Sequence, residues 1–309
     1  MKVLVLGGYG AVGGPLADML RRDGADVVAA GRDPDRADEV LDLGDAALSA
    51  YQAALRGIDV VVNASGAENP RLAGLAGESG CAFVDVGASV GYLDRLRQLP
   101  SRAAILVDIG LAPGLTNLLA VAVHTAAPGP IDVAVLLGAG ERHGAAATEW
   151  SYLLLGSHFR EDGRVVRNYT RPETFVLPGH RRPRRLFRLD FSDQHTLRRE
   201  LGVPVRTYFG LDSRAATAAL AALTWLPGAS KAPRGLHLPG SDRWIVLARG
   251  DDGTTRWAHG RNQSRATAAV AAAATARAVH APPGVHALHH ILGLADIPAE
   301  YVEIGRDAP

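Results

Sequence analysis

Near its N-terminus the chain reads KVLVLGGYGAVGGPLADML over residues 2–20. Residues 2–6 have the apolar pattern of a buried strand, and the pattern from Pro15 to Asp23 predicts a helix. Between them, Gly8-Tyr9-Gly10-Ala11-Val12-Gly13 forms G-x-G-x-x-G, and Gly7 adds an overlapping G-x-x-G-x-x-G. Glycines at these places let the backbone turn tightly, approach a pyrophosphate and bring the helix close to the strand. The stretch therefore predicts a dinucleotide-binding turn between a strand and a helix.

The rest of the first third alternates short β-branched runs with helical patterns, which is typical of βαβ units in a parallel sheet. The runs predicted as strands are residues 25–30, 39–43, 58–63, 82–86 and 105–109, with helices over 48–55 and 71–79. These strands are nearly all apolar, as expected when helices cover both faces of a sheet. An apolar helix is expected from Pro113 to about Ala126, with proline at an early helical position.

After Pro128-Gly129-Pro130 the pattern changes. It predicts strands over 131–137 and 244–249, antiparallel strands within 164–191, and a hairpin turn at Asp251-Asp252-Gly253. Helices are expected over 145–155, 194–201, 214–226 and, capped by Ser264, to about residue 281. We therefore expect an α/β chain with an N-terminal Rossmann domain, a doubly wound parallel sheet, in residues 1–127. A C-terminal α+β domain for substrate binding and dimerisation would follow in 128–309, with the C-terminal tail free to pack back on the Rossmann domain.

Composition excludes several classes of function. A length of 309 residues fits two domains. With 33 Lys and Arg against 32 Asp and Glu, the net charge of +1 offers no field for nucleic acid or anionic membranes. No apolar run reaches the ~18–20 residues of a membrane span, and the start lacks a secretion signal. The single cysteine, Cys81, is interpreted as a core residue in a reducing compartment. We expect a cytoplasmic protein that binds neither nucleic acid nor membranes.

The end of the strand over 25–30 bears on the choice of cofactor. An NAD site usually has Asp or Glu there to hold the ribose 2′-hydroxyl. This strand ends in Ala30-Gly31-Arg32-Asp33-Pro34. Arg32 suits a 2′-phosphate, and Gly31 leaves room for it. Asp33 is the counter-argument, because it either caps the next turn or restores some NAD binding. We predict NADP(H).

Small-residue loops follow two further predicted strands, at Asn63-Ala64-Ser65-Gly66 and Asp85-Val86-Gly87-Ala88. They are expected beneath the ribose and nicotinamide half of the cofactor, and Asp42-Leu43 beside the adenine. The predicted cofactor-binding residues are Gly7, Gly8, Tyr9, Gly10, Ala11, Val12, Gly31, Arg32, Asp33, Leu43, Ala64, Ser65, Gly66, Gly87 and Ala88.

The opening Gly7-Gly8-Tyr9-Gly10-Ala11-Val12-Gly13 and the strand end Ala30-Gly31-Arg32-Asp33 resemble the saccharopine dehydrogenase-like (saccharopine reductase-type) group of NADP-binding oxidoreductases. The likeness extends to Gly110-Leu111-Ala112-Pro113-Gly114-Leu115-Thr116-Asn117, to Gly260-Arg261-Asn262-Gln263-Ser264 and to Thr267-Ala268. It implies a Rossmann domain joined to an α+β domain, hydride transfer in the cleft between them, and a homodimer. It also implies that the Ala112-Pro113-Gly114 turn lies near the nicotinamide.

A short-chain dehydrogenase of the extended type also opens with G-x-x-G-x-x-G. Its chemistry needs a Tyr-x-x-x-Lys pair. The two lysines of this chain are Lys2 and Lys231, and no tyrosine has a lysine four residues on. The sequence therefore excludes that catalytic centre, along with most mechanisms built on a catalytic lysine.

A hydride enzyme needs a group that moves the substrate proton. The best candidates follow the strand over 131–137, where the second domain would face the cofactor. Glu149 and Tyr152 share a helix face, and His143 comes near the start of that helix. The alternative is a solvated helix face with a capping histidine. We expect His143, Glu149 and Tyr152 to be the catalytic residues.

Three further patterns have structural and functional interpretations. Arg181-Arg182-Pro183-Arg184-Arg185 suits either a substrate carboxylate or solvent, and its proline favours an edge strand. His286, His289 and His290 have helical spacing but no supporting cysteine or paired carboxylate, so no metal is predicted. His195 is expected in the first turn of a helix capped by Asp193.

We therefore expect an NADPH-dependent oxidoreductase that reduces a C=N, C=O or activated C=C bond in a small-molecule substrate, with an amino-acid-derived imine as the first choice. The alternative is a non-catalytic NADP(H)-binding sensor or scaffold protein. Cofactor and fold leave the substrate undetermined.

Overall fold

The computed structural model describes residues 1–140, 153–229 and 240–306. The chain forms two compact units. Unit 1 contains Met1–Leu115 and Ser264–Pro298, and unit 2 contains Thr116–Gln263 and Ala299–Pro309. The expected division at residue 127 differs from this one, because helix α5 (Thr116–Ala126) packs on β7, β13 and α7 of unit 2. The tail segment over 264–298 returns to the Rossmann unit.

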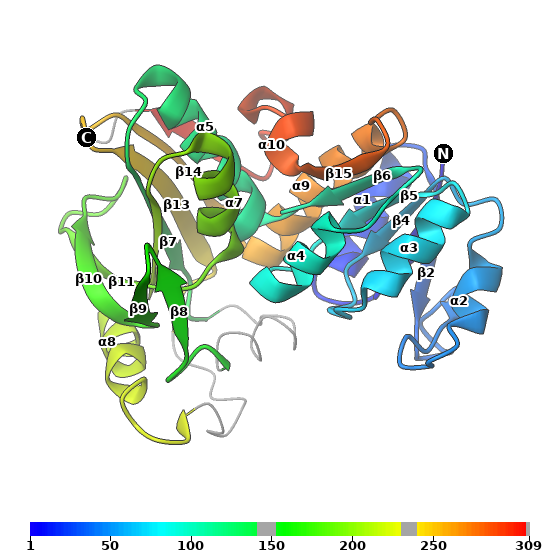
Figure 1. Cartoon of the computed structure of the whole chain (residues 1–309), viewed down its shortest axis with the longest axis horizontal. Coiled ribbons are helices and arrows are strands. Elements are labelled where there is room, and N and C mark those ends of the chain that lie inside the picture. Colours follow the sequence, from blue (N-terminus) through cyan, green and yellow to red (C-terminus); the bar gives the residue numbers. More distant parts are fainter. Residues whose placement is uncertain (141–152, 230–239, 307–309) are drawn as a thin grey trace. The chain divides into compact units, whose positions relative to one another are not determined.

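Unit 1 is built on a seven-stranded sheet with the strand order β15-β6-β5-β4-β1-β2-β3 (Figure 1). Its strands are β1 (Lys2–Leu6), β2 (Asp26–Gly31), β3 (Glu39–Val40), β4 (Val60–Asn63), β5 (Ala82–Asp85), β6 (Ala104–Val107) and β15 (Gly284–Ala287). All of its strand pairs are parallel. The chain winds outward from β1 in one direction and resumes at β4 in the other, so the predicted doubly wound sheet is confirmed.

Helices cover both faces of this sheet. They are α1 (Gly13–Arg22), α2 (Ser49–Ala54), α3 (Pro70–Glu78), α4 (Val90–Arg97), α9 (Gln263–Ala278) and α10 (Leu288–Ile291). Leu4 and Leu6 belong to a core cluster that also includes buried residues of α2, α3 and α4. Val3 and Val5 point to the opposite face and are also fully buried. Because side chains alternate along β1, this strand contributes apolar side chains to the core on both faces of the sheet.

Cys81 lies in the core of unit 1, as predicted. It has no solvent exposure, and its Sγ lies 3.2 Å from the carbonyl oxygen of Ile58. Burial raises the pKa of the Cys81 thiol, which keeps the thiol protonated and unreactive.

The apolar helix expected from Pro113 begins instead at Thr116. Residues Leu111–Leu115 form an irregular turn with a cis Ala112–Pro113 bond. Gly114 has φ +131° and ψ −88°, which no helical residue adopts, so α5 has to start after it. The Leu115 N–H donates to the carbonyl of Gly110 at 2.8 Å and closes the turn.

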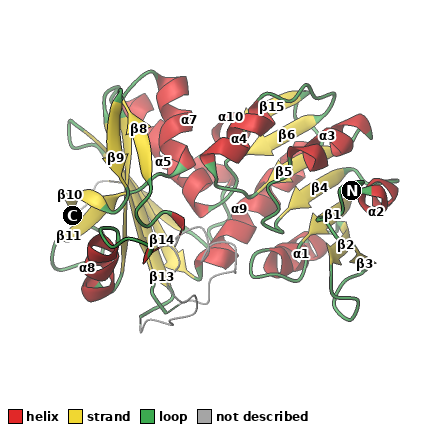
Figure 2. Ribbon diagram, turned by 60° about the horizontal axis from the view of Figure 1, so that its bottom comes forward, coloured by secondary structure: helices red, strands yellow, loops and turns green. Residues whose placement is uncertain are grey.

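Unit 2 contains a mixed sheet with the strand order β10-β11-β12-β7-β13-β14-β16 (Figure 2). Its strands are β7 (Ile131–Leu137), β10 (Thr170–Phe175), β11 (Arg184–Arg188), β12 (Val205–Leu211), β13 (Arg243–Gly250), β14 (Thr255–Arg261) and β16 (Glu303–Arg306). The hairpin β8 (His158–Glu161) and β9 (Arg164–Arg167) is separate, and the described residues of unit 2 form the helices α5, α7 (Ser192–Leu201) and α8 (Arg214–Leu223). The predicted α+β character and the β13–β14 hairpin are confirmed.

Three local predictions in the second half of the chain are wrong. Strand β11 pairs with both β10 and β12, so Pro183 precedes an interior strand rather than an edge strand. Helix α9 begins at Gln263, one residue before the expected cap at Ser264. His286 lies on β15, whereas His289 and His290 lie on α10, so the three histidines do not share a helix face. His286 Nε2 lies 3.0 Å from the carbonyl oxygen of Pro282.

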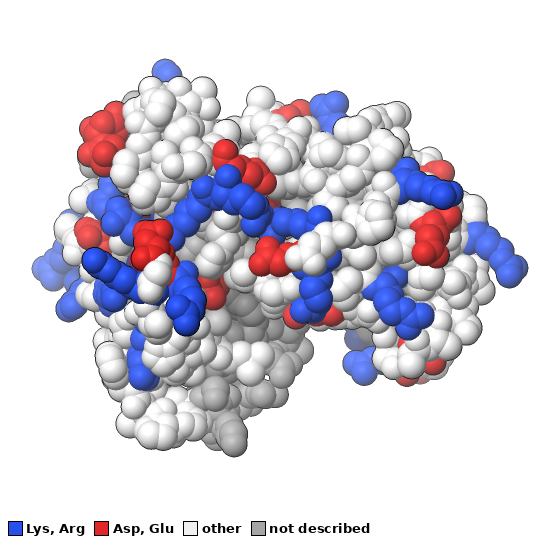
Figure 3. Space-filling model, viewed as in Figure 1, with Lys and Arg blue, Asp and Glu red and all other residues white. Residues whose placement is uncertain are grey.

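The distribution of charged side chains and the hydropathy of the helices agree with the expectations from composition. On the face drawn in Figure 3, basic and acidic side chains are interspersed over the surface. Within the described ranges, no helix is both long enough and apolar enough to cross a membrane.

Substitution of Phe83, in the middle of β5, tests how much the core of unit 1 contributes to the free energy of unfolding. Its side chain is fully buried, so we expect Phe83→Ala to lower the free energy of unfolding by about 3–5 kcal/mol. Val40→Ala on the edge strand β3, where the side chain is 52% exposed, is the control and should change it by less than about 0.5 kcal/mol. Urea unfolding followed by circular dichroism measures both. Equal losses would contradict the packing described.

Candidate functional site

The glycine loop follows β1 at the carboxyl edge of the unit 1 sheet. The N–H groups of Gly7 and Gly8 both donate to the carbonyl of Ala30, at 2.8 and 3.1 Å. The Gly10 N–H donates to the carbonyl of Gly7 at 2.9 Å. These bonds tie the loop to the end of β2 and place it at the switch point between β1 and β4, where open α/β sheets bind their ligands.

Two of the glycines are required by close approaches. Gly7 has φ +74°, and a Cβ there would lie 2.7 Å from the Cα of Ser65. A Cβ on Gly13 would lie 2.1 Å from the carbonyl oxygen of Gly7. Any larger residue at Gly13 would therefore push the start of α1 away from β1.

The N-terminus of α1 is available to an anion. Among the described residues, no side chain caps this helix, and its first turn contains no acidic residue. Gly10 and Ala11, just before the helix, are exposed. Uncapped N–H groups and the positive end of the helix dipole form a ready binding site for a pyrophosphate.

Tyr9 lies against the end of β2. A Cβ on Gly31 would lie 2.3 Å from the Tyr9 ring, so the space that Gly31 leaves is filled by this ring rather than kept open for a ligand. The Tyr9 hydroxyl accepts a hydrogen bond from the Asp33 N–H at 2.9 Å. Tyr9 thus links the glycine loop to the turn that follows β2.

Asp33 stabilises the turn after β2 through hydrogen bonds. Its Oδ1 accepts the N–H of Asp35 at 3.1 Å, and its carbonyl accepts the N–H groups of Arg36 and Ala37. This is the capping alternative of the two considered for Asp33.

Two arginines flank the same turn. Arg32 is exposed, and no hydrogen bond or ion pair joins its guanidinium to another part of the described chain. The Arg36 guanidinium lies 4.5 Å from the centre of the Tyr9 ring and donates to the Tyr9 carbonyl at 3.0 Å. Arg36 was not predicted from the sequence, although it follows Arg32 by only four residues. The stacking of Arg36 on Tyr9 depends on tertiary structure, so the sequence does not reveal it.

A buried polar cluster holds the loops after β4 and β5. Asp85 is fully buried and accepts hydrogen bonds from Asn63 Nδ2 (2.8 Å), the Tyr92 hydroxyl (2.7 Å) and the Gly87 N–H (2.6 Å). Burial raises the pKa of Asp85 to about 6, and the hydrogen bonds act in the opposite direction. Asn63 Oδ1 accepts from the Ser65 hydroxyl at 2.7 Å. Asn63 and Asp85 therefore position the two small-residue loops, which contain Ala64, Gly66 and Ala88.

Two segments that are far apart in the sequence meet in unit 1. The Leu111 N–H donates to the Thr267 hydroxyl at 3.3 Å, and a Cβ on Gly110 would meet the Thr267 side chain at 3.3 Å.

Leu43, expected beside the adenine, packs against the core cluster.

The remaining candidates are distributed as follows. His143, Glu149 and Tyr152 lie outside the described residues. His195 Nε2 lies 2.5 Å from Asp190 Oδ1. Asp193 does not cap α7 as expected, because it lies inside the helix, fully buried, with Oδ1 accepting from the Thr207 hydroxyl at 2.8 Å.

The arginines of residues 181–185 differ in their surroundings. Arg184 is buried and donates to the carbonyl of Leu211 at 2.6 Å, whereas Arg181 and Arg182 are exposed. Arg261 is paired with Asp242 at 3.0 Å.

No protein-family model and no curated protein matches the chain. Among solved structures, a meso-diaminopimelate dehydrogenase variant from Clostridium tetani E88 is 11% identical, with 96% of each chain covered and a TM-score of 0.48. An amine dehydrogenase from Mycobacterium smegmatis is 13% identical over 95% of this chain and 96% of that one, with a TM-score of 0.47. A Lactobacillus casei protein is 31% identical, but the match covers 28% of this chain and 47% of the other, with a TM-score of 0.23. The residues of the site itself therefore decide which function is proposed.

The buried cluster predicts a pH-dependent hydrogen bond. The pKa of Asp85 is about 6 in the folded chain against an ordinary value of 3.8, so its contribution to stability falls as the pH rises from about 4 through 6. Above pH 6, Tyr92 donates to a carboxylate. Tyr92→Phe should then cost about 1.5–3 kcal/mol at pH 8 and about 0.5–1.5 kcal/mol at pH 5, where the acceptor is largely neutral.

Tyr51→Phe is the matched control. Tyr51 is equally buried, and its hydroxyl donates to the uncharged carbonyl of Leu72 at 2.9 Å. Urea unfolding at both pH values should show a loss for Tyr51→Phe that does not change with pH. A pH-independent loss for Tyr92→Phe would show that Asp85 does not titrate in this range.

Proposed function

We propose that the chain is an NADP(H)-dependent oxidoreductase, which reduces a C=N, C=O or activated C=C bond of a small metabolite, with an amino-acid-derived imine as the first choice. The observation that carries the proposal is the uncapped start of α1 behind the glycine loop, at the switch point of a doubly wound sheet. The resemblance to the saccharopine dehydrogenase-like group supports it. The homodimer that this resemblance implies stays a prediction.

The end of β2 supports the preference for a 2′-phosphate. Asp33 Oδ1 accepts the N–H of Asp35 within its own turn, which supports the capping role of this carboxylate over a ribose contact. Arg32 is exposed without a partner in the described chain, and Arg36 is held in place on the Tyr9 ring. Two guanidiniums at this edge match the charge and the acceptor oxygens of a phosphate.

The chain's own residues then have distinct tasks. Gly7, Gly8 and Gly10 shape the loop through their own backbone hydrogen bonds, and Ala11 and Val12 would bind the pyrophosphate through backbone N–H groups at the start of α1. Asn63 and Asp85 hold the loops on which the ribose and the nicotinamide would rest. The nicotinamide, when bound, supplies or accepts the hydride. We propose that His143, Glu149 or Tyr152 moves the proton to or from the substrate.

Cofactor selectivity is tested by titrating the protein with NADPH and NADH. Arg32→Ala removes a charged hydrogen bond to the 2′-phosphate and should weaken NADPH binding by about 1.5–3 kcal/mol, or roughly 10- to 150-fold. Arg36→Ala should act in the same direction, and neither variant should change NADH binding much. Arg102→Ala, exposed just before the amino end of β6, is the control and should leave both affinities unchanged.

Other outcomes of this titration contradict parts of the proposal. Equal affinity for both cofactors, unaffected by Arg32→Ala, would assign the ribose contact to Asp33 and refute the NADP preference. Binding of neither cofactor would refute the oxidoreductase proposal itself.

Catalysis is tested by NADPH oxidation with a panel of imines and ketones. Once a substrate is found, His143→Gln, Glu149→Gln and Tyr152→Phe are compared with the wild-type chain. Removal of the proton donor should lower kcat by about 10²–10⁴-fold, while the affinity for NADPH stays unchanged. If all three variants turn over at the wild-type rate, the catalytic assignment is wrong. NADPH binding without any turnover would favour the sensor or scaffold alternative.

A further inference from the structure

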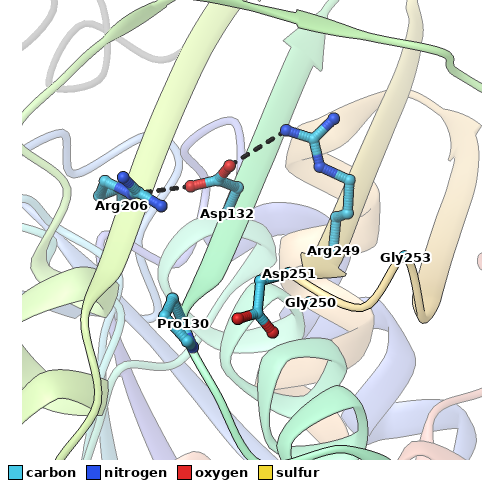
Figure 4. A pocket seen from close by; sticks show the side chains of 7 residues that line it. All are labelled: Pro130, Asp132, Arg206, Arg249, Gly250, Asp251 and Gly253. Carbon is cyan, nitrogen blue, oxygen red and sulfur yellow. Dashed lines mark hydrogen bonds and ion pairs between the residues drawn. The ribbon is translucent and has the colours of Figure 1, made fainter.

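A small pocket lies at one end of the unit 2 sheet, where β7 and β12 begin and β13 ends (Figure 4). Its volume is about 300 Å³, and its charged lining residues are Asp132, Arg206, Arg249 and Asp251. That volume is at the lower end of the range for small-molecule sites, about 300–1,000 Å³. The glycine loop and the cofactor-binding turns belong to unit 1, so the cofactor proposal does not account for this pocket.

Strand register brings three of these side chains into one row. Asp132 on β7 pairs directly with Arg206 on β12 and with Arg249 on β13, so all three point to the same face of the sheet. Arg206 Nε lies 2.9 Å from Asp132 Oδ1, and Arg249 Nη2 lies 3.0 Å from Asp132 Oδ2 (Figure 4). Asp132, whose side chain is 14% exposed, therefore pairs with both guanidiniums, and Arg249 Nη2 also lies 3.7 Å from Glu173 Oε1.

The two guanidiniums differ in how firmly they are held. Arg249 also lies 4.6 Å from the centre of the Phe175 ring and donates to the carbonyl of Thr174 at 3.3 Å. The side chain of Arg206 is 40% exposed. In the described part of the chain, its Nη1 and Nη2 atoms have no hydrogen-bond acceptor. Arg206 thus offers unused donors in the fork geometry that matches a carboxylate.

Asp251 supplies the opposite charge from the β13–β14 turn. The turn itself is held by its neighbour Asp252, whose carboxylate accepts from the Thr254 N–H at 2.9 Å and from the Thr254 hydroxyl at 2.7 Å. Asp251 is exposed and forms no ion pair with any described cation. Figure 4 shows its carboxylate directed away from Arg249. The absence of a side chain at Gly129 leaves space for it, because a Cβ there would lie 2.7 Å from Asp251 Oδ1.

We propose that this pocket binds a small zwitterion, an α-amino acid with a free ammonium and a free carboxylate. The ligand carboxylate would accept from the Nη atoms of Arg206, and the ammonium would donate to Asp251. An anion alone would face the Asp132 and Asp251 carboxylates, and a cation alone would face two guanidiniums. A zwitterion offers a partner of opposite charge to both Arg206 and Asp251, which is the requirement for specificity in a charged site.

The pocket lies in unit 2, apart from the proposed cofactor-binding turns of unit 1. The pocket lies at the amino end of β7, and the segment proposed to hold the proton donors follows the carboxyl end. These ends are about 20 Å apart, since β7 has seven residues at about 3.3 Å each. The inference does not depend on the oxidoreductase proposal.

The test screens the full-length protein against the common L-amino acids by isothermal titration calorimetry. We expect at least one of them to bind with one-to-one stoichiometry. Arg206→Gln and Asp251→Asn should each weaken that binding at least about tenfold, because each removes one charged partner. Arg164→Gln is the control. Arg164 is an exposed arginine at the start of β9 in the same unit, and the variant should bind like the wild type. Circular dichroism checks that the variants fold.

Two derivatives of the best ligand separate the charges. Acetylation of its amino group and amidation of its carboxylate should each weaken binding to a similar degree. An N-acetyl derivative that binds as tightly as the parent would define an anion site and refute the zwitterion proposal. Failure of every amino acid to bind, or binding that both pocket variants leave unchanged, would also overturn it. None of these outcomes bears on NADPH affinity, so the two proposals fail independently.

Discussion

The close approach of helix α1 to strand β1 is the constraint on which the candidate site depends. The start of α1 lies so near the loop that a Cβ on Gly13 would come within 2.1 Å of the Gly7 carbonyl oxygen. The same loop is bonded to the end of β2 through Ala30. Because the loop is held from both sides, the positive end of α1 faces a fixed place at the carboxyl edge of the sheet. A looser contact would leave an ordinary helix start with no preformed anion site.

One side chain of the glycine loop, Tyr9, connects this contact to the turn that we propose selects the cofactor. Tyr9 belongs to the glycine loop, yet its ring covers Gly31, its hydroxyl accepts from Asp33 and its face carries Arg36. The loop proposed to bind the pyrophosphate and the turn proposed to bind the 2′-phosphate are therefore one connected structure. On the other side of the switch point, Asn63 and Asp85 play the corresponding part for the loops after β4 and β5. In both cases a polar side chain positions the backbone that a ligand would touch.

The sequence was sufficient for features that depend on local pattern. The parallel strands, the glycine turn, the β13–β14 hairpin and the core position of Cys81 all follow from periodicity, turn chemistry and residue type. Features that depend on contacts between distant segments were missed or wrong. Strand β15, which has only four residues, pairs with β6 and was not predicted. The backbone conformation of Gly114 makes α5 begin later than predicted. The interior position of β11 and the stacking of Arg36 on Tyr9 likewise depend on tertiary pairing, which no short window of sequence contains.

Amide hydrogen exchange of the protein, alone and with NADPH or NADH at equal saturation, tests the central claim most directly. If the cofactor lies at the start of α1 with its 2′-phosphate on the turn after β2, both cofactors should slow exchange over residues 8–14. NADPH should slow exchange over residues 31–37 more than NADH does. Saturation with NADPH that leaves residues 8–14 unchanged would contradict the account, because the cofactor would then bind elsewhere on the chain.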